Sequence, residues 1–347
     1  MYVIKAVGQQ NLGVWQNYVD NHPLASGMHH AGWYQILKHS FGVRLEFLFA
    51  QNDKGAIDGV LPMYLSRSLL ADCHLTTLDD GLLADNSEAA TTLINAAITR
   101  RDLLGARYLL IRAGAEHTGE WAPTAIRPIV RRIVHTGVGS PELLSRLSSY
   151  VRRDIRRAAK RGYSIRLDDR LHCLDTSFYD EYAAHMRHLG TPVFGRLMMT
   201  AIKKYLGPER LRLYLAMRGE EVVGGLLCVM AKSGWLALYG VVRENLLREY
   251  VNYLLYWHAI TEAADAGVAY FDLGRNTPGG GVHEFKSKWP GEDRESEHYY
   301  FARSGAGAPN FGKLYQGRSL KQRIWMKLPL GMTNRLGPVL RRQLPFG

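Results

Sequence analysis

Between Tyr270 and Gly291, the sequence YFDLGRNTPGGGVHEFKSKWPG combines groups that could hold a negatively charged reactant. An apolar strand ends at a glycine, polar side chains and three consecutive glycines follow, and two lysines and a tryptophan close the segment. Polar groups that emerge from a strand beside a glycine loop can be presented to a ligand together with free backbone N–H groups. A glycine-rich surface connection is the alternative interpretation. The candidate binding residues are Arg275, Asn276, Thr277, Lys286, Lys288 and Trp289.

A second segment, HMRHLGTPVFGRLMM, places the candidate binding residues Thr191 and Phe194 directly after a predicted helix. His185 and His188 lie three residues apart in that helix, but no third ligand has a suitable spacing, so we predict no metal site. The sequence also lacks the phosphate-loop, GxGxxG, GxSxG and HExxH motifs. This argues against P-loop NTPases, Rossmann oxidoreductases, α/β-hydrolases and zinc peptidases.

The sequence SYVRRDIRRAAKRGYSIRLDD predicts a cationic helix that ends at Gly162. Apolar residues recur in it at helical spacing, and acidic residues are nearly absent from it. A solvated charged face and an anion-binding site are both consistent with this pattern, and the scarcity of acids favours the anion site. The cations that would bind an acidic donor or acceptor are Arg152, Arg153, Arg156 and Lys160.

The excess positive charge is concentrated in two segments. The chain has 44 Lys and Arg against 32 Asp and Glu; residues 127–170 hold 12 basic and 4 acidic residues, and residues 311–347 hold 8 basic and no acidic ones. Such surfaces attract tRNA, a nucleotide diphosphate or an anionic membrane. The second segment interleaves cations with apolar residues and a tryptophan. We expect there either a basic amphipathic helix for the headgroup layer of an anionic leaflet or a helix packed across the domain junction.

Composition indicates a globular protein, because 46% of the residues are hydrophobic and 10% are aromatic. No run of about 18 apolar residues occurs, and the N-terminus MYVIKAVGQQ lacks the pattern of a secretory signal. We therefore expect a cytoplasmic protein that could lie at the inner membrane through its basic tail. The three cysteines are far apart and form no CxxC pair, which favours buried thiols over a disulfide or a zinc site.

The elements that must position these residues form a faint internal repeat. Each half of the chain reads as a strand hairpin, a long helix and a short strand introduced by glycine. This order predicts an α/β (α+β) fold in which a mixed, mostly antiparallel sheet flanked by helices occurs twice. Two pairs of matching positions, Ala50/Ala216 and Gly59/Gly225, are 166 residues apart. Two further pairs, Gly105/Gly267 and Tyr108/Tyr270, are 162 residues apart.

The ordered set LPMYLSRS, TTLDDGLLAD, LGARYLLIR, VRRDIRRAAKRGYSIR, LGTPVFGR, FDLGRNTPGGGVHEFKSKWPG and KLPLGMTNRLGPVLRR resembles the FemAB-like proteins associated with exosortase (PEP-CTERM) and exopolysaccharide loci, within the GNAT superfamily of N-acetyltransferases. The resemblance covers nearly the whole chain. It implies two tandem GNAT-like domains, in residues 1–138 and 139–307, followed by a basic tail in residues 308–347.

The resemblance implies an N-acyltransferase or aminoacyltransferase that acts on an amine of a lipid-linked, cell-envelope or exopolysaccharide precursor. The donor would be acyl-CoA or aminoacyl-tRNA, with no metal. The chain departs from typical acetyltransferases because RENLLREYVNY follows the central strand where an RxxGxG/A loop would wrap the CoA diphosphate. It also lacks the long helical arm of some tRNA-dependent Fem enzymes. Both donors therefore stay open.

Acyl transfer to an amine needs positioning, a base and stabilisation of an oxyanion, and no protein nucleophile. We expect Asp80 or Asp272 to act as the base, and Tyr239 and Asn252 to orient the acceptor. Two alternatives remain. One is a non-catalytic binding or assembly factor for an anionic glycan or lipid-linked intermediate. The other is a nucleic-acid binder, although no RRM, KH or zinc-finger signature supports it; DNA is not an expected partner.

Overall fold

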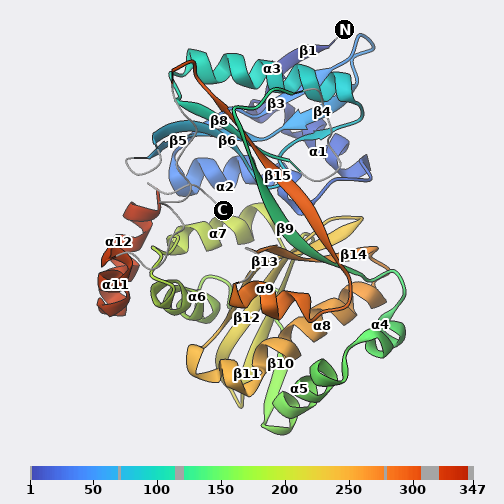
Figure 1. Cartoon of the computed structure of the whole chain (residues 1–347), viewed down its shortest axis with the longest axis vertical. Coiled ribbons are helices and arrows are strands. Elements are labelled where there is room, and N and C mark those ends of the chain that lie inside the picture. The colour runs from blue at the N-terminus through green and yellow to red at the C-terminus, as the bar shows by residue number, and fades with distance from the viewer. Residues whose placement is uncertain (1, 69–71, 114–120, 277–279, 306–319, 343–347) are drawn as a thin grey trace. The chain divides into compact units, whose positions relative to one another are not determined.

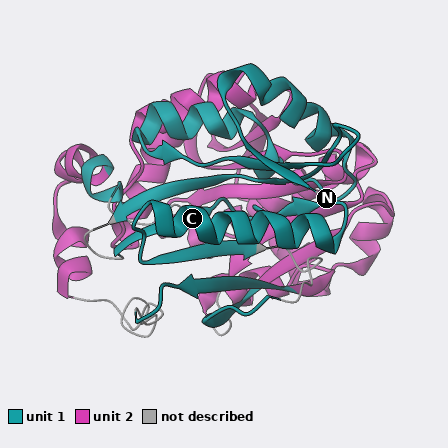
Figure 2. Cartoon of the chain, turned by 90° about the horizontal axis from the view of Figure 1, so that it is seen from above, with its two compact units in different colours: residues 1–129, 295–319, 338–347 teal, residues 130–294, 320–337 magenta. Residues whose placement is uncertain are grey.

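The computed structural model describes residues 2–68, 72–113, 121–276, 280–305 and 320–342. The chain forms two compact units, each built from separate stretches of sequence (Figure 2). Unit 1 comprises residues 1–129, 295–319 and 338–347, and unit 2 comprises residues 130–294 and 320–337. The domain boundaries expected at 138/139 and 307/308 differ from these units, because two long strands leave one unit and enter the other.

Unit 1 carries a four-stranded sheet in the order β1-β3-β4-β7 and a second set of strands in the order β15-β8-β6-β5-β2 (Figure 1). The long helix α3 contacts β3, β4 and β8, and its apolar residues Leu93, Ile94 and Ala97 are fully buried there. The elements are β1 (Val3–Ala6), α1 (Leu12–Asn21), α2 (Gly32–Phe41), β2 (Arg44–Leu45), β3 (Leu48–Gln51), β4 (Ile57–Leu61), β5 (Met63–Ser68), β6 (Asp72–Thr77), β7 (Leu83–Ala84), α3 (Ser87–Leu103) and β8 (Tyr108–Ala113).

Unit 2 has strands in the order β10-β11-β12-β13-β14-β9, antiparallel except for the parallel pair β13 and β14. Helix α8 contacts each of β10 to β14, and α4 and α5 pack on α8. The elements that follow β8 along the chain, of which β9, β15 and α12 each have residues in both units, are β9 (Ala125–His135), α4 (Ser140–Arg146), α5 (Ser149–Lys160), β10 (Tyr163–Leu167), α6 (Ser177–His188), α7 (Arg196–Leu206), β11 (Leu211–Arg218), β12 (Glu221–Met230), β13 (Gly234–Val242), α8 (Val251–Asp265), β14 (Tyr270–Asn276), α9 (Gly281–Ser287), β15 (Glu292–Ala302), α11 (Leu320–Lys327) and α12 (Leu330–Arg341).

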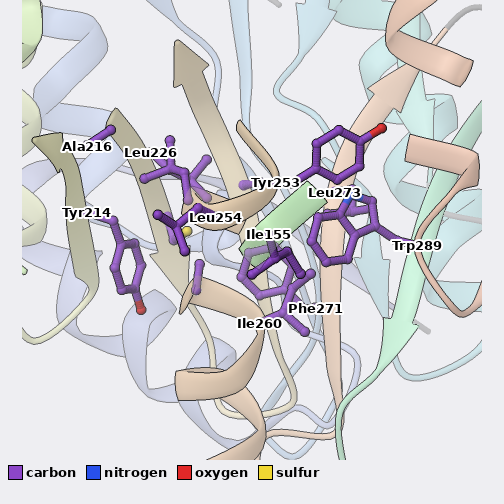
Figure 3. Packing of buried hydrophobic residues seen from close by; sticks show 14 of the residues in the cluster. Ile155, Tyr214, Ala216, Leu226, Tyr253, Leu254, Ile260, Phe271, Leu273 and Trp289 are labelled. Atoms are coloured by element: carbon purple, nitrogen blue, oxygen red, sulfur yellow. The ribbon is translucent and has the colours of Figure 1, made fainter. Parts of the chain in front are cut away.

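The core of unit 2 lies between this sheet and helices α5 and α8 (Figure 3). Ile155 from α5, Leu254 and Ile260 from α8, and Phe271 from β14 are buried in one cluster. These residues recur at helical spacing in the helices and alternate with polar ones in the amphipathic α5, so burial of one face orients each helix. Helices α5 and α8 therefore pack against the sheet and stabilise it near the start of α8 and the end of β14.

The predicted repeat is confirmed. The hairpin β3–β4 corresponds to β11–β12, α3 corresponds to α8, and β8 corresponds to β14. Gly105 and Gly267 end the two helices with φ of +65° and +71°, a left-handed conformation that favours glycine. In both units, the strand after the helix begins with a short parallel pairing, β6 with β8 and β13 with β14.

A reciprocal exchange of strands completes the two repeats. Strand β9, which follows the first repeat in sequence, pairs antiparallel with β14 in unit 2. Strand β15, which follows the second repeat, pairs antiparallel with β8 in unit 1. Each repeat thus takes its last strand from the other half of the sequence. Strand pairing depends on contacts between residues that are distant in the sequence. The local sequence pattern therefore predicted the repeated elements but not the partners of β9 and β15.

Candidate functional site

Strands β13 and β14 are paired only where they begin. The parallel register covers three residue pairs and ends at Leu236 and Asp272. Beyond this point, within the described residues, β13 keeps β12 as its partner and β14 keeps β9. Both partnerships have a register shift there, at Leu227/Cys228 in β12 and between Asp272 and Arg275 in β14. The carboxyl ends of two parallel strands therefore separate, and this is where open α/β sheets bind ligands.

Gly274 forms a turn within β14 at this divergence. Its φ is +78°, and its N–H donates to Asp272 Oδ1 at 2.6 Å. A Cβ atom at this position would lie 3.2 Å from the carbonyl oxygen of Ala237 in β13 and 3.6 Å from Lys286 Nζ. Both the conformation and the close approach therefore require glycine. The turn directs the carbonyl groups of β14 toward the ammonium of Lys286.

Lys286, on α9, places a nearly buried cation at the divergence. Its side chain is 7% exposed, and Nζ donates to the carbonyl oxygens of Gly274 and Arg275 at 2.9 and 2.8 Å. An ammonium has three N–H groups, so these bonds leave one for a further acceptor. Desolvation lowers the pKa of Lys286 to about 8; Asp272 raises this pKa, whereas Arg131 and Arg275 lower it further. The group is mainly protonated at pH 7 and deprotonates just above it.

Asp272 and Arg131 form an ion pair beside Lys286. Arg131 Nη2 lies 2.5 Å from Asp272 Oδ2, and both side chains are almost fully buried. The other carboxylate oxygen, Oδ1, accepts the N–H of Gly274. Because both oxygens are engaged, the structure favours a positioning role for Asp272 over the predicted role of general base. Sequence reasoning did not single out Arg131; the signal was a charged residue inside the otherwise apolar strand IVRRIV.

Charges at the divergence are predominantly positive. Arg131 and Arg275 act electrostatically on Lys286, and so does the carboxylate of Asp272. A centre of this kind stabilises negative charge on a bound group. Lys288 is exposed, with its ammonium 6.0 Å from the ring centroid of Tyr253. Of the predicted cations in this segment, Arg275 and Lys286 are therefore brought together.

Asn276 ends β14 as a buried amide. Its side chain is 8% exposed, and neither its nitrogen nor its oxygen has a hydrogen-bond partner among the residues that the structure describes. A buried amide without partners costs free energy. This residue therefore has unused donors and acceptors next to Arg275, as the sequence analysis expected of a binding residue. Thr277, also predicted to bind, lies outside the described residues.

Trp289 and Phe194 are core residues rather than ligand-binding ones, which corrects the prediction for both. Trp289 is 1% exposed and packs on the rings of Tyr253, Tyr256 and Phe285; Figure 3 shows it beside Tyr253. Its carbonyl accepts two bonds from the guanidinium of Arg132, which anchors the end of the loop. Phe194 is 3% exposed, and its carbonyl accepts the hydroxyl of Tyr179 at 2.9 Å. Both side chains are large and apolar, and their place beside polar motif residues does not reveal that they are buried in the core.

The remaining predicted site residues lie in separate parts of unit 2. Tyr239, in β13, is partly buried, and its ring centroid lies 5.1 Å from that of Tyr182. Asn252, in the first turn of α8, uses Oδ1 to accept the N–H of Tyr253. Thr191 is partly buried, and its N–H donates to Met186 at the end of α6. The roles of Tyr239 and Asn252 in orienting an acceptor and of Thr191 in binding remain predictions.

The predicted cationic helix is α5, and its arginines divide into two groups. Arg152 donates through Nη1 to the carbonyl oxygens of Leu144, Ser145 and Leu147, so it caps the end of α4. Arg153 stacks on the exposed ring of Tyr150 at 4.9 Å, and Arg156 and Lys160 are exposed. The capping contacts favour a structural role for Arg152, and the prediction of an anion-binding residue stays open for all four.

Two arginines that were not among the predicted residues lie at the C-terminal end of α5, next to the start of α8. Arg157 and Arg161 stand over the ring of Tyr250 at 5.9 and 5.7 Å, and Arg161 pairs with Glu249 at 2.8 Å. Tyr250 has a left-handed backbone, with φ of +65°, and precedes the first residue of α8. The basic end of α5 thus borders the N-terminus of α8, where partial positive charge attracts anions.

The segment between β13 and α8 is a short 3-10 helix, Glu244–Glu249, instead of a glycine loop. Leu246 is buried within it, which fills the space beside the backbone. Arg243, which opens the segment, pairs with Glu181 at 2.6 Å and Glu221 at 2.5 Å. Neither a backbone cradle for a diphosphate nor an uncommitted arginine at position 243 is therefore present in this described segment.

In unit 1, the corresponding strands β6 and β8 are held together beyond their parallel pairing. Gly81 N–H donates to the carbonyl of Arg112 at 2.9 Å, and Arg112 pairs with Asp79, so the two strands are bridged beyond their parallel register. Asp80 has φ of +54°, and its carbonyl accepts the imidazole of His29. This geometry assigns the DDG sequence a turn-forming role, and the predicted catalytic role of Asp80 remains a prediction.

Comparisons with known proteins agree with this geometry. Residues 145–287, within unit 2, match the family model described as an acetyltransferase (GNAT) domain. That segment runs from the end of α4 to the end of α9 and includes the divergence of β13 and β14. No curated protein sequence matches the chain.

Several solved structures share the fold of nearly the whole chain. FemX has a TM-score of 0.65 at 15% identity, over 91% of this chain and all of its own. L-PGS from Bacillus licheniformis has a TM-score of 0.53 at 12% identity, over 96% of this chain and 98% of its own. A tandem GNAT protein from the clavulanic acid biosynthesis pathway, solved without AcCoA, has a TM-score of 0.52 at 12% identity, over 89% and 99%. The predicted tandem GNAT-like fold is confirmed.

Proposed function

We propose that unit 2 is an N-acyltransferase or aminoacyltransferase that acylates an amine of a cell-envelope or exopolysaccharide precursor. The observation that carries this proposal is the position of Lys286, whose desolvated ammonium lies where β13 and β14 separate. The acetyltransferase (GNAT) match over residues 145–287 and the resemblance to FemAB-like proteins support the reaction class and the type of acceptor.

In the proposed reaction, the nitrogen lone pair of the acceptor amine attacks the carbonyl carbon of the donor. The carbon–nitrogen bond forms, the carbonyl π electrons move to oxygen, and the third N–H of Lys286 donates to this oxyanion. When the oxyanion collapses, the bond to the leaving oxygen or sulfur breaks. The leaving group takes up one proton, and the amine loses one. Asp272 and Arg131 hold the Gly274 turn, and through it the position of Lys286.

Between the two donor classes, we propose aminoacyl-tRNA. The segment after β13 offers no glycine cradle for a CoA diphosphate, and Arg243 is held by two glutamates. The start of α8 is instead bordered by Arg157 and Arg161, which stack on Tyr250. Arginine–aromatic surfaces of this kind suit the phosphates and bases of RNA.

A donor panel tests the proposal. Thermal unfolding of the full chain is followed with acetyl-CoA, a long-chain acyl-CoA, aminoacyl-tRNA and deacylated tRNA, since a ligand that binds the folded state raises the melting temperature. We expect the largest rise with aminoacyl-tRNA. A rise with an acyl-CoA instead would overturn the assignment of the donor. Binding of none of them would remove the support for an enzyme and leave the non-catalytic binding factor.

Variants connect the donor to the site. Arg275→Ala should abolish the donor-induced shift and leave the melting temperature of the free protein nearly unchanged. The control is Arg67→Ala, an exposed arginine in β5 of unit 1, which should keep the full shift. If Arg275→Ala lowers the melting temperature of the free protein strongly, Arg275 is a structural residue and the binding assignment is wrong.

A further inference from the structure

Helix α12 packs with its apolar stripe outward. Met332, Leu336, Val339 and Leu340 follow one another at i, i+4, i+7 and i+8, and all four are exposed, Val339 by 63%. The adjacent stripe, Thr333, Gly337 and Arg341, is buried. A helix on a water-exposed surface normally buries its apolar stripe. The orientation of α12 is the reverse of this rule.

Close packing fixes this orientation. A Cβ atom on Gly337 would lie 3.0 Å from Val193 Cγ1 and 3.1 Å from the Val193 nitrogen. The buried stripe of α12 therefore lies so close to Val193 at this point that a side chain on residue 337 would crowd it. In the preceding helix α11, Trp325 is buried, and Arg187 of α6 donates to the carbonyl of Leu328 at 3.0 Å. Trp325 therefore anchors the segment from inside, which corrects its expected place in a headgroup layer.

Helix α11 continues the exposed apolar surface. Leu320 and Ile324 lie one turn apart and are 73% and 53% exposed. Figure 1 shows α11 and α12 as the two red helices that follow one another near the C-terminal end of the described chain. Neither helix is long and apolar enough to span a bilayer, as holds for every helix in the described part of the chain. A surface of this kind suits the plane of a membrane interface.

Cations border the apolar surface. The exposed basic residues of the two helices and the residue after them are Lys321, Arg323, Lys327, Arg335 and Arg342. The sequence contains no Asp or Glu from residue 298 to residue 347. In a helical projection, Arg335 and Arg342 flank the Met332–Val339 stripe on the side away from the buried stripe. Long basic side chains there can reach lipid headgroups while the apolar residues enter the acyl boundary.

We propose that the outward face of α11 and α12 docks the protein on an anionic membrane leaflet. The complementarity is twofold: an apolar stripe for the acyl boundary and neighbouring exposed cations for anionic headgroups. Docking would bring the proposed transferase to lipid-linked acceptors, and this purpose rests on the proposed function. Binding to a membrane is measured without turnover, so failure of either proposal can be distinguished from failure of the other.

The experiment is co-sedimentation of the full chain with vesicles of phosphatidylcholine alone or mixed with phosphatidylglycerol. We expect binding to the mixed vesicles, weakened by salt, and little binding to phosphatidylcholine. The double variant Leu336→Glu, Val339→Glu should lower the partition coefficient more than about tenfold, since it places two charges in the acyl boundary. Each of Arg335→Gln and Arg342→Gln should lower it about fivefold. The control, Leu103→Glu, changes a leucine in α3 that is even more exposed, and this variant should bind like the unchanged protein.

Three outcomes would overturn the proposal. The unchanged protein would not bind mixed vesicles, or the Leu336→Glu, Val339→Glu variant would bind them as well as the unchanged protein. In the third, light scattering would show a dimer that this variant converts to a monomer, in which case the face covers a second copy of the chain. Circular dichroism checks that the variants fold; should the double variant unfold, the two arginine variants decide.

Discussion

Lys286 provides a test of the site that needs no knowledge of the substrate. Its pKa falls from an ordinary 10.5 to about 8, mainly through desolvation. At pH 7 both the folded and the unfolded protein carry the protonated side chain, so the folded protein bears the full cost of the buried charge. A shift of this size corresponds to about 3 kcal/mol at pH 7. Between pH 8 and 10.5 the unfolded state binds more protons, so stability rises with pH and the cost diminishes.

The perturbation is Lys286→Met, which keeps the length of the side chain and removes the charge. It also leaves the carbonyls of Gly274 and Arg275 without their donor, at about 1–3 kcal/mol each. This loss does not depend on pH, whereas the cost of the buried ammonium does. The informative quantity is therefore the change with pH of the difference in unfolding free energy between the two proteins. From pH 7 to pH 9.5, we expect the original protein to gain about 2 kcal/mol relative to the variant.

The assay is urea unfolding followed by tryptophan fluorescence at both pH values. Groups that titrate equally in both proteins cancel in the difference. Lys288→Met is the matched control, because it removes an exposed ammonium two residues away and measures the effect of one surface charge. A difference between original and Lys286→Met proteins that stays constant with pH, or that moves in favour of the variant, would refute a desolvated ammonium at the strand divergence.

Three further substitutions test the supporting contacts. Arg131→Leu leaves Asp272 buried without its partner and should cost about 3–5 kcal/mol in urea unfolding, and a loss below about 1 kcal/mol would contradict the role of the ion pair. Gly274→Ala should lower the free energy of unfolding by about 1–3 kcal/mol because of the positive φ, and it should also weaken donor binding. An unchanged thermal shift with the donor would show that the turn does not contribute to the site. Arg152→Ala should lower stability by about 1 kcal/mol without affecting donor affinity, whereas a selective loss of affinity would support its predicted role as an anion ligand.

The repeat and the basic helix could be predicted because local patterns determine them. Turn residues between apolar runs, a long helical pattern and Gly267 at its end fix the order of elements without tertiary information. Gly162, likewise, follows α5 with φ of +83°. Amphipathic periodicity and glycine stops are properties of adjacent residues, so sequence alone reveals them.

The site was only partly predictable. Arg275, Asn276 and Lys286 were found because they follow a strand and a glycine turn in one segment. Arg131 was missed because β9 reaches β14 from a distant part of the sequence, in the exchanged arrangement of strands. Trp289 and Phe194 were misassigned because burial depends on which helices cover them. Local sequence therefore revealed the chemistry of the loop, and tertiary pairing determined which charges meet.

The most direct test of the central claim is a structure of the protein with a non-reactive analogue of the donor that the thermal-shift panel identifies. We predict that the carbonyl oxygen of the transferable group lies within about 3 Å of Lys286 Nζ, between the separated ends of β13 and β14. An analogue bound with its carbonyl away from Lys286, or bound within unit 1, would contradict the account.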